Sequence, residues 1–291
     1  MQSARLSIPN LARLAAAQVL RLVPGAAALG LKRDLRDAAW LDEADSVVIS
    51  FPKSGRTFVR AMVARLYQRR FGIDDRKLLE FAALRHAPAG APRLLFTHDG
   101  NPLRPPDKIR IDPASYAGKR CVLIARHPAD VTVSLYHHLK HRSRVRARQR
   151  LAEQPLDTFI WSKHGGIPSV VAFLNRAAAL PGVTIVRYED FLTEPAQSLR
   201  TLADAIGLET SDEEIADAVE FGSLASLRKR EQEGYFTSSR LRRARKGDEK
   251  SGKVRSGTSG GYRAQLGAEQ AAWIDTYLRD HLDPRLGYSG A

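Results

Sequence analysis

Residues 47–58 read Val47-Val48-Ile49-Ser50-Phe51-Pro52-Lys53-Ser54-Gly55-Arg56-Thr57-Phe58. The β-branched start is typical of a buried strand, and the apolar residues after Thr57 recur at helical spacing. Gly55 permits a tight turn between the two, and a helix N-terminus adds partial positive charge. This strand, loop and helix predict a cradle for a bound phosphate, with Lys53 as a cation beside it and Ser54 and Thr57 as hydroxyl donors.

Two further short apolar runs, Cys121–Ala125 and Val183–Val186, are also predicted strands. Helical patterns follow them over residues 130–140 and 195–206, and residues 273–282 form a last predicted helix. Strands that alternate with helices favour a single-domain α/β fold, in which a parallel sheet is flanked by helices around a P-loop-like nucleotide-binding core. Ligands of such sheets bind where strands end and loops lead into helices.

The order of residues in the first loop separates it from common nucleotide-binding loops. The Walker pattern G-x-x-x-x-G-K-[ST] is absent, because Lys53 precedes Gly55. A phosphoryl-transfer enzyme stays an alternative, and it would need a magnesium-binding carboxylate after a strand, for which Asp190 is a weak candidate.

The second predicted strand ends in a further phosphate-binding pattern. Arg126 offers a planar fork of donors at the strand end, which suits a second phosphate, and we expect Ser134 to face the same ligand from two turns along the following helix. Pro128 suits the first turn of the intervening helix.

Together the two patterns resemble those of the sulfotransferases that use 3′-phosphoadenosine-5′-phosphosulfate (PAPS). Residues 51–58 are similar to that family's Y-P-K-S-G-T-T-W loop, with Arg56 in place of a threonine and Phe58 in place of the tryptophan that stacks on adenine. Residues 126–137 resemble R-N-P-x-D-x-x-x-S-x-Y-H, with His127 in place of asparagine. The resemblance implies PAPS as co-substrate, 3′,5′-adenosine bisphosphate (PAP) as product and no metal ion. It also implies that Ser134 holds Lys53 aside until an acceptor binds.

Three further elements extend the resemblance toward the C-terminus. Residues 255–263 resemble R-K-G-x-x-G-x-W-K, which closes over the 3′-phosphate, and Arg255, Ser256 and Gly257 would act there. Tyr188 begins a Y-E-D sequence and would lie near adenine, and Ser223 matches an adenine-side serine. The family's dimer element is absent after residue 262, so the oligomeric state stays open.

His98 is the predicted general base. It ends the strand-like run Leu94–Thr97, and histidine titrates near neutral pH. The run resembles the family's K-T-H element, in which the histidine is catalytic and Phe96 stands in place of the lysine. Asp99 either orients the ring or caps the turn. Sulfuryl transfer needs a base at the acceptor and a cation at the leaving oxygen, a role that the resemblance gives to Lys53.

Length and composition set the domain plan and the cellular setting. The chain has 291 residues, of which 43% are hydrophobic, and we expect an N-terminal helical segment over 1–40 and a sulfotransferase domain over 41–291. The segment 11–22 has one apolar side, which docks on the core or lies on a membrane surface. Arg13 and Arg21 interrupt it, so a spanning helix and a cleaved signal peptide are not expected. The single cysteine, Cys121, favours a cytoplasmic setting, with or without membrane association.

The formal net charge of +14 attracts polyanions, and basic runs cover residues 140–150 and 240–255. A polyanion-binding protein, whose ligand is nucleic acid or an acidic membrane, is therefore the other alternative. No recognised nucleic-acid motif or aromatic stacking face accompanies these runs, so nucleic acid is not the expected partner. The expected acceptor is a small molecule, a sugar or a lipid, bound by residues 73–92, 140–166 and 231–245.

Overall fold

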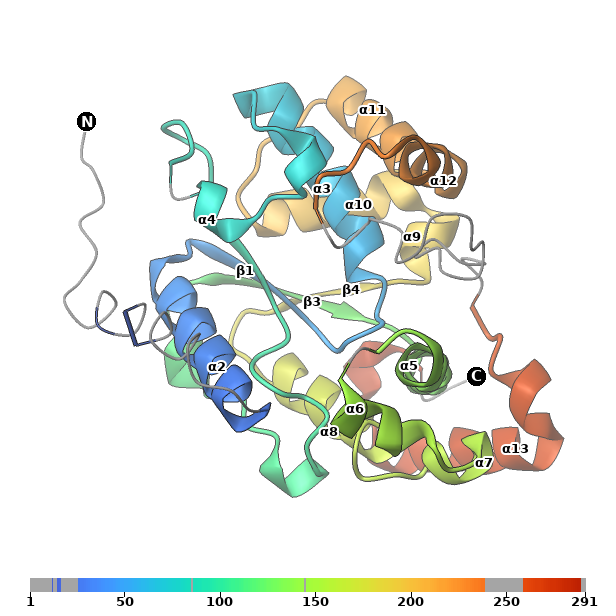
Figure 1. The fold of residues 1–291 in the computed structure, drawn as a ribbon. Helices are drawn as coiled ribbons and strands as arrows, with labels where there is room; N and C mark the ends of the chain where they lie inside the picture. Colours follow the sequence, from blue (N-terminus) through green and yellow to red (C-terminus); the bar gives the residue numbers. More distant parts are fainter. Residues whose placement is uncertain are drawn as a thin grey trace.

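The computed structural model describes residues 26–84, 86–143, 145–238 and 259–288, together with the isolated residues 12, 15 and 16. Its centre is a parallel sheet of four strands in the order β2-β1-β3-β4 (Figure 1). The strands are β1 (Ser46–Ser50), β2 (Leu94–Thr97), β3 (Arg120–Ala125) and β4 (Thr184–Arg187). The predicted α/β class and the predicted strands are thereby confirmed.

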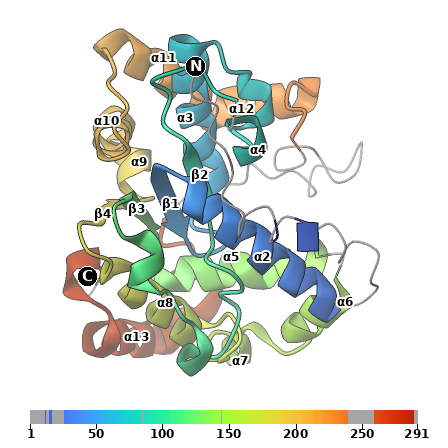
Figure 2. The same cartoon turned by 90° about the vertical axis from the view of Figure 1, so that its left-hand side faces the viewer.

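Helices cover both faces of this sheet. One group comprises α2 (Ala26–Glu43), α5 (Pro128–His141), α8 (Ile167–Ala178) and α13 (Arg263–His281). The other group comprises α3 (Arg56–Phe71), α10 (Pro195–Ala205), α11 (Asp212–Gly222) and α12 (Leu224–Glu233). Shorter helices are α4 (Phe81–Leu84), α6 (Arg146–Gln149), α7 (Leu156–Phe159) and α9 (Asp190–Thr193), and Figure 2 shows α6 and α7 on the same side of the sheet as α5.

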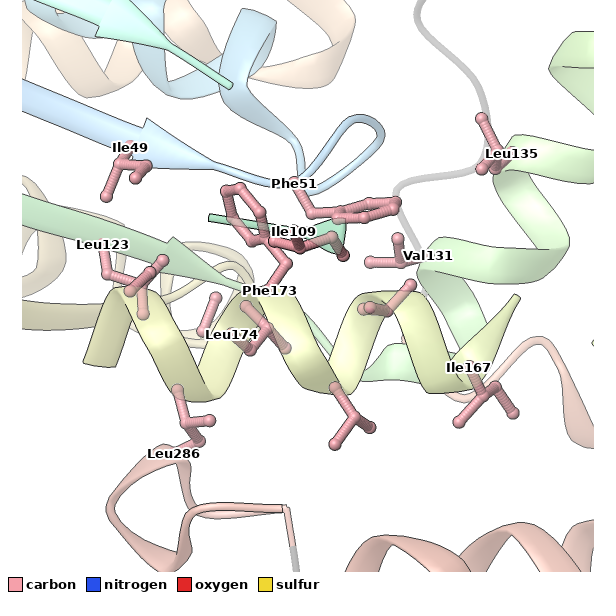
Figure 3. Packing of buried hydrophobic residues seen from close by; sticks show 14 of the residues in the cluster. Ile49, Phe51, Ile109, Leu123, Val131, Leu135, Ile167, Phe173, Leu174 and Leu286 are labelled. Carbon is pink, nitrogen blue, oxygen red and sulfur yellow. The ribbon is translucent and has the colours of Figure 1, made fainter. Parts of the chain in front are cut away.

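Strand alternation divides the apolar residues between two cores. Val47 and Ile49 of β1 join one buried cluster, and Val48 joins the other. Figure 3 shows the first cluster, in which the Phe51 ring meets Phe173 of α8 edge to face at 5.5 Å. Each core covers one face of the sheet. A ligand is therefore expected at the edges of the sheet or at the loops that follow the strands.

Local sequence signals explain where the main helices begin and end. Glycines in the left-handed region flank α3, with φ of 79° at Gly55 and 69° at Gly72. Pro128 opens α5 at a position where its missing N–H costs nothing. Ser211 and Glu214 form a reciprocal capping box at the start of α11.

Two predictions concern the N-terminal part of the chain. Helix α2 runs across the expected boundary between residues 40 and 41, and Leu41 and Trp40 pack on the first core. The predicted amphipathic helix 11–22 lies almost entirely outside the described residues. Within the described residues, no helix has the length and apolarity needed to cross a bilayer.

Candidate functional site

The candidate site lies at the edge of the sheet where its four strands end. The strands are parallel and in register, with Ile49 opposite Thr97 and Ala125 opposite Arg187. Their carboxyl ends therefore lie side by side. The segments that follow the four strands contain the predicted site residues: Lys53 follows β1, His98 follows β2, Arg126 follows β3 and Tyr188 follows β4.

The loop after β1 has the backbone of an anion cradle. Lys53 has φ of 76° and Gly55 has φ of 79°, both in the left-handed region that turns the chain sharply into α3. The first N–H groups of a helix have no acceptor within the helix and can bind an anion. In α3 the N–H of Phe58 is already used, because it donates to the Gly55 carbonyl at 2.9 Å. The loop thus places Ser54 and Thr57 at a helix N-terminus, where an anion is stabilised by the dipole.

Ser54 fits a ligand that brings hydrogen-bond acceptors to the loop. Its side chain is fully buried, and its Oγ lacks a hydrogen-bond partner among the described residues. A buried hydroxyl without a partner costs free energy unless a ligand satisfies it. A phosphate or sulfuryl oxygen provides that acceptor, so the loop is chemically suited to the phosphosulfate of PAPS.

Tyr188 packs directly on this loop. A Cβ atom added to Gly55 would lie 2.1 Å from Cδ2 of the Tyr188 ring, so only glycine fits there. Phe58, the first aromatic residue of α3, meets the same ring edge to face at 6.0 Å. Burial raises the pKa of the Tyr188 phenol, which Arg126 partly offsets, so the ring is neutral near pH 7.

Arg126 joins the two predicted phosphate motifs. Its Nη1 donates a hydrogen bond to the backbone carbonyl of Lys53 at 3.0 Å. Its guanidinium carbon also lies 4.5 Å from the centre of the Tyr188 ring. Ser134 lies two turns along α5 from the end of β3 and is half-buried.

His98 is held against the end of β1. Its Nδ1 lies 2.6 Å from the backbone carbonyl oxygen of Ser50. A carbonyl only accepts hydrogen bonds, so Nδ1 carries the proton and the lone pair of the neutral ring is on Nε2. In this tautomer Nε2 is the ring nitrogen that can accept a proton, and the sequence contained no signal for the Ser50 contact.

The residues next to His98 support its turn. Asp99 is in the left-handed region with φ of 49°, and its N–H donates to Thr97 Oγ1 at 2.9 Å. The Asp99 carboxylate accepts a hydrogen bond from the Tyr116 hydroxyl at 3.0 Å. Phe96 is buried beneath the guanidinium of Arg60, whose carbon lies 4.5 Å from the ring centre.

The end of the predicted 3′-phosphate loop is tied to the start of α5. Arg255, Ser256 and Gly257 lie outside the described residues, but Gly260 and Tyr262 lie within them. The Asp130 carboxylate accepts the N–H of Gly260 at 2.7 Å and that of Tyr262 at 3.1 Å. Asp130 lies within the second motif, residues 126–137, but its role could not be predicted from the sequence.

The His127 ring contacts two tyrosines, Tyr262 and Tyr288. Its ring stacks on Tyr262 with centroids 4.7 Å apart and meets Tyr288 edge to face at 5.5 Å. Its backbone N–H donates to Glu189 Oε1 at 3.0 Å, and Tyr288 O–H donates to Glu189 Oε2 at 2.5 Å. Burial lowers the pKa of the His127 ring, although Asp130 and Glu189 act in the opposite direction.

The remaining candidates are less closely tied to this edge. Ser223 caps α12, where its Oγ accepts the N–H of Ser226 at 3.2 Å, and its role near adenine stays a prediction. Asp190, the weak magnesium candidate, pairs instead with Arg187 at 2.6 Å. In the part of the chain that the structure describes, no group of three or more histidine, cysteine or carboxylate side chains is arranged to hold a metal ion. The basic run 240–255 lies outside the described residues.

Comparisons with known proteins identify the family and support the fold. The model of the sulfotransferase domain family matches residues 113–284, which include Arg126, Ser134 and Tyr188 but not the loop after β1 or His98. The fold is similar to that of mouse sulfotransferase SULT7A1 complexed with PAP, with a TM-score of 0.55 and 15% sequence identity over 84% of this chain and 88% of that chain.

Two solved structures of retinol dehydratase are also similar in fold. The complex with androsterone and the inactive cofactor PAP has a TM-score of 0.50 and 18% identity, covering 85% of this chain and 84% of that one. The complex with retinol and PAP has a TM-score of 0.53 and 17% identity, covering 86% and 85%. With the family model matching more than half of its length, the chain belongs to the sulfotransferase domain family and is an enzyme of the PAPS-dependent sulfotransferase class.

Proposed function

We propose that this protein transfers the sulfuryl group of PAPS to a hydroxyl or amine of an acceptor by in-line displacement, with His98 as the general base. The observation that carries the proposal is the 2.6 Å contact of His98 Nδ1 with the Ser50 carbonyl. It leaves the basic Nε2 lone pair on a residue that follows β2, the strand next to the one that leads into the phosphate loop.

The proposed reaction assigns one role to each side chain. Nε2 of His98 accepts the proton of the acceptor hydroxyl, and the hydroxyl oxygen attacks sulfur. The bond between sulfur and the bridging phosphate oxygen breaks, and the electron pair stays on that oxygen. Lys53 stabilises the new negative charge on the leaving oxygen, and PAP is the product. Before the acceptor binds, Ser134 holds Lys53 away from that oxygen.

The proposed nucleotide site uses the two loops that Arg126 connects. Ser54, Gly55, Thr57 and the first turn of α3 would bind the 5′-phosphosulfate, and Arg126 and Ser134 would bind the 3′-phosphate. Phe58 would offer an aromatic face to adenine, and Tyr188 and Ser223 would lie near the same base. Arg255, Ser256 and Gly257 would close over the 3′-phosphate, as the family resemblance implies. Arg56 opens α3 beside this loop, and we include it in the nucleotide site without a separate role.

Titration calorimetry with PAP is the first test of the proposal. We expect binding with one nucleotide per chain, and a folded protein that produces no heat with PAP contradicts the nucleotide site. A transfer assay then follows labelled sulfate from PAPS to a panel of phenols, alcohols, amines, sugars and lipids. The panel includes retinol and a steroid alcohol, because similar solved structures hold retinol and androsterone.

A Lys53→Ala variant separates binding from chemistry in the same assay. We expect its kcat to fall by about 10²-fold or more, because the leaving oxygen loses its cation. Lys53→Arg, which keeps the charge, is the matched control and should retain more of the activity. Unchanged turnover in Lys53→Ala contradicts the assigned role.

A further inference from the structure

We propose that Glu189 is a positioning residue that sets Arg126 for recognition of a 3′-phosphate, an inference that rests on the proposed function. Glu189 follows β4 and is the first residue after Tyr188. Its Oε1 accepts the backbone N–H of His127 at 3.0 Å, and its Oε2 accepts the Tyr288 hydroxyl at 2.5 Å. One carboxylate therefore connects the ends of β3 and β4 with the C-terminal region.

The His127 N–H belongs to the peptide unit that directly follows Arg126. That unit is planar, so holding its N–H fixes its plane and with it the ψ angle of Arg126. At the other end, the Arg126 guanidinium donates to the Lys53 carbonyl at 3.0 Å and lies over the Tyr188 ring. The arginine is thus held at its backbone by Glu189 and at its tip by the phosphate loop.

Tyr288 in turn fixes Glu189. Tyr288 is buried, with 8% of its surface exposed, and its ring lies against His127 at 5.5 Å. Burial and the nearby Glu189 raise the pKa of the Tyr288 phenol, so its hydroxyl stays a hydrogen-bond donor at neutral pH. A fixed carboxylate loses little entropy when it orients its partner, and pre-organised ligand groups bind more tightly.

The neighbouring carboxylate provides a matched control. Asp190 follows Glu189 in the chain, but it pairs with the Arg187 side chain at 2.6 Å instead of a site peptide. Replacing either residue by its amide removes one formal charge at nearly the same place. Only Glu189→Gln disturbs the peptide that carries Arg126.

The experiment compares two nucleotides that differ by the 3′-phosphate, PAP and adenosine 5′-monophosphate (AMP). For Glu189→Gln we expect the Kd for PAP to rise about tenfold, whereas the Kd for AMP stays within about twofold, because the nucleotide group that the proposal assigns to Arg126 is the 3′-phosphate. Asp190→Asn should change neither Kd. Tyr288→Phe removes only the hydroxyl that steadies Glu189, and should weaken PAP binding selectively but by a smaller factor.

The outcomes distinguish this inference from the proposed function. If Glu189→Gln and Tyr288→Phe keep the full preference of the wild type for PAP over AMP, the positioning role is wrong and the nucleotide site stands. Equal loss of PAP and AMP binding in both variants also contradicts it, since this indicates a general structural effect. If the folded wild type binds neither nucleotide, the proposed function fails and the role of Glu189 with it.

Discussion

Arg126 Nη1 donates a hydrogen bond to the carbonyl oxygen of Lys53 at 3.0 Å, although the two residues lie 73 positions apart in the chain. The contact connects the loop after β1 with the loop after β3, which are neighbouring strands of the sheet. Each loop contributes a cation to the same edge. This arrangement suits a nucleotide that carries phosphate groups at two separated positions, and the predictions below test its parts.

The role of His98 is tested by two substitutions. We expect His98→Ala to lower kcat by about 10²-fold or more, because the acceptor hydroxyl loses its base, while the Kd for PAP stays unchanged. His98→Asn places an amide N–H near the position of Nδ1 and keeps a donor toward the Ser50 carbonyl, but it has no basic nitrogen. It should be as inactive as His98→Ala in the labelled-sulfate assay, and near-normal turnover in either variant contradicts the assignment.

The buried hydroxyl of Ser54 predicts opposite effects on stability and on binding. Ser54→Ala removes a polar group without a partner, so the free energy of unfolding without nucleotide should stay level or rise by about 1 kcal/mol. The Kd for PAP should rise about tenfold, because the loop loses one donor. Denaturant unfolding and calorimetry measure the two effects.

Ser50→Ala is the control for Ser54, since the Ser50 hydroxyl is also buried and lacks a partner among the described residues. Its backbone carbonyl, which holds His98, is retained in the variant. Affinity for PAP should therefore be preserved. If Ser54→Ala binds PAP as tightly as the wild type, the Ser54 hydroxyl is not a phosphate ligand.

Gly55→Ala should damage the loop more than a left-handed glycine elsewhere. Both Gly55 and Gly72 have positive φ, so an alanine costs about 1–2 kcal/mol of backbone strain at either position. At Gly55 the new Cβ also lies 2.1 Å from the Tyr188 ring, whereas at Gly72 it meets nothing within 4 Å. We expect a further loss of about 1–3 kcal/mol and weakened PAP binding only for Gly55→Ala. Equal unfolding free energies for the two variants would show that the ring yields without cost.

His127 predicts how stability depends on pH. Burial holds the pKa of its ring below the usual value of 6.5 in the folded protein. Between the folded and the unfolded pKa, the unfolded chain binds more protons, so stability is full above about pH 6.5 and falls as the pH decreases. His127→Asn, which restores the family's residue, should flatten this part of the profile. Thermal unfolding between pH 5 and pH 8, values that bracket the ordinary histidine pKa, measures the slope, and an unchanged slope contradicts the prediction.

Local patterns were sufficient for much of this architecture. The strands around Val48, Val122 and Ile185 were predicted because apolar, β-branched runs of that length bury themselves in a parallel sheet. Helix α8, by contrast, was missed although it lies in the first core. Its sequence contains Pro168 and adjacent valines at 170 and 171, which are weak helix formers, and tertiary packing overrides that preference.

The residues of the candidate site could likewise be predicted from the sequence only in part. Lys53, Ser54, Gly55 and Arg126 were predicted to bind phosphate because their residue types and order are typical of phosphate-binding loops. The residues that connect the neighbouring segments were not predicted from the sequence. Asp130, Glu189 and Tyr288 act through contacts with backbone N–H groups and with a carboxylate oxygen, and such contacts leave no pattern in a sequence.

Short-range order along the chain thus specified the alternation of strands and helices, the phosphate-loop residues and the place of His98 at a strand end. These features depend on side-chain type and on spacing within one turn or one strand, where the chain itself sets the distances. Two contacts form only when the sheet is assembled. One is the contact of the Ser50 carbonyl that selects the His98 tautomer, and the other is the contact of the Lys53 carbonyl that holds Arg126. They join residues 48 and 73 positions apart, and strand order, which no local pattern encodes, brought them within hydrogen-bonding distance.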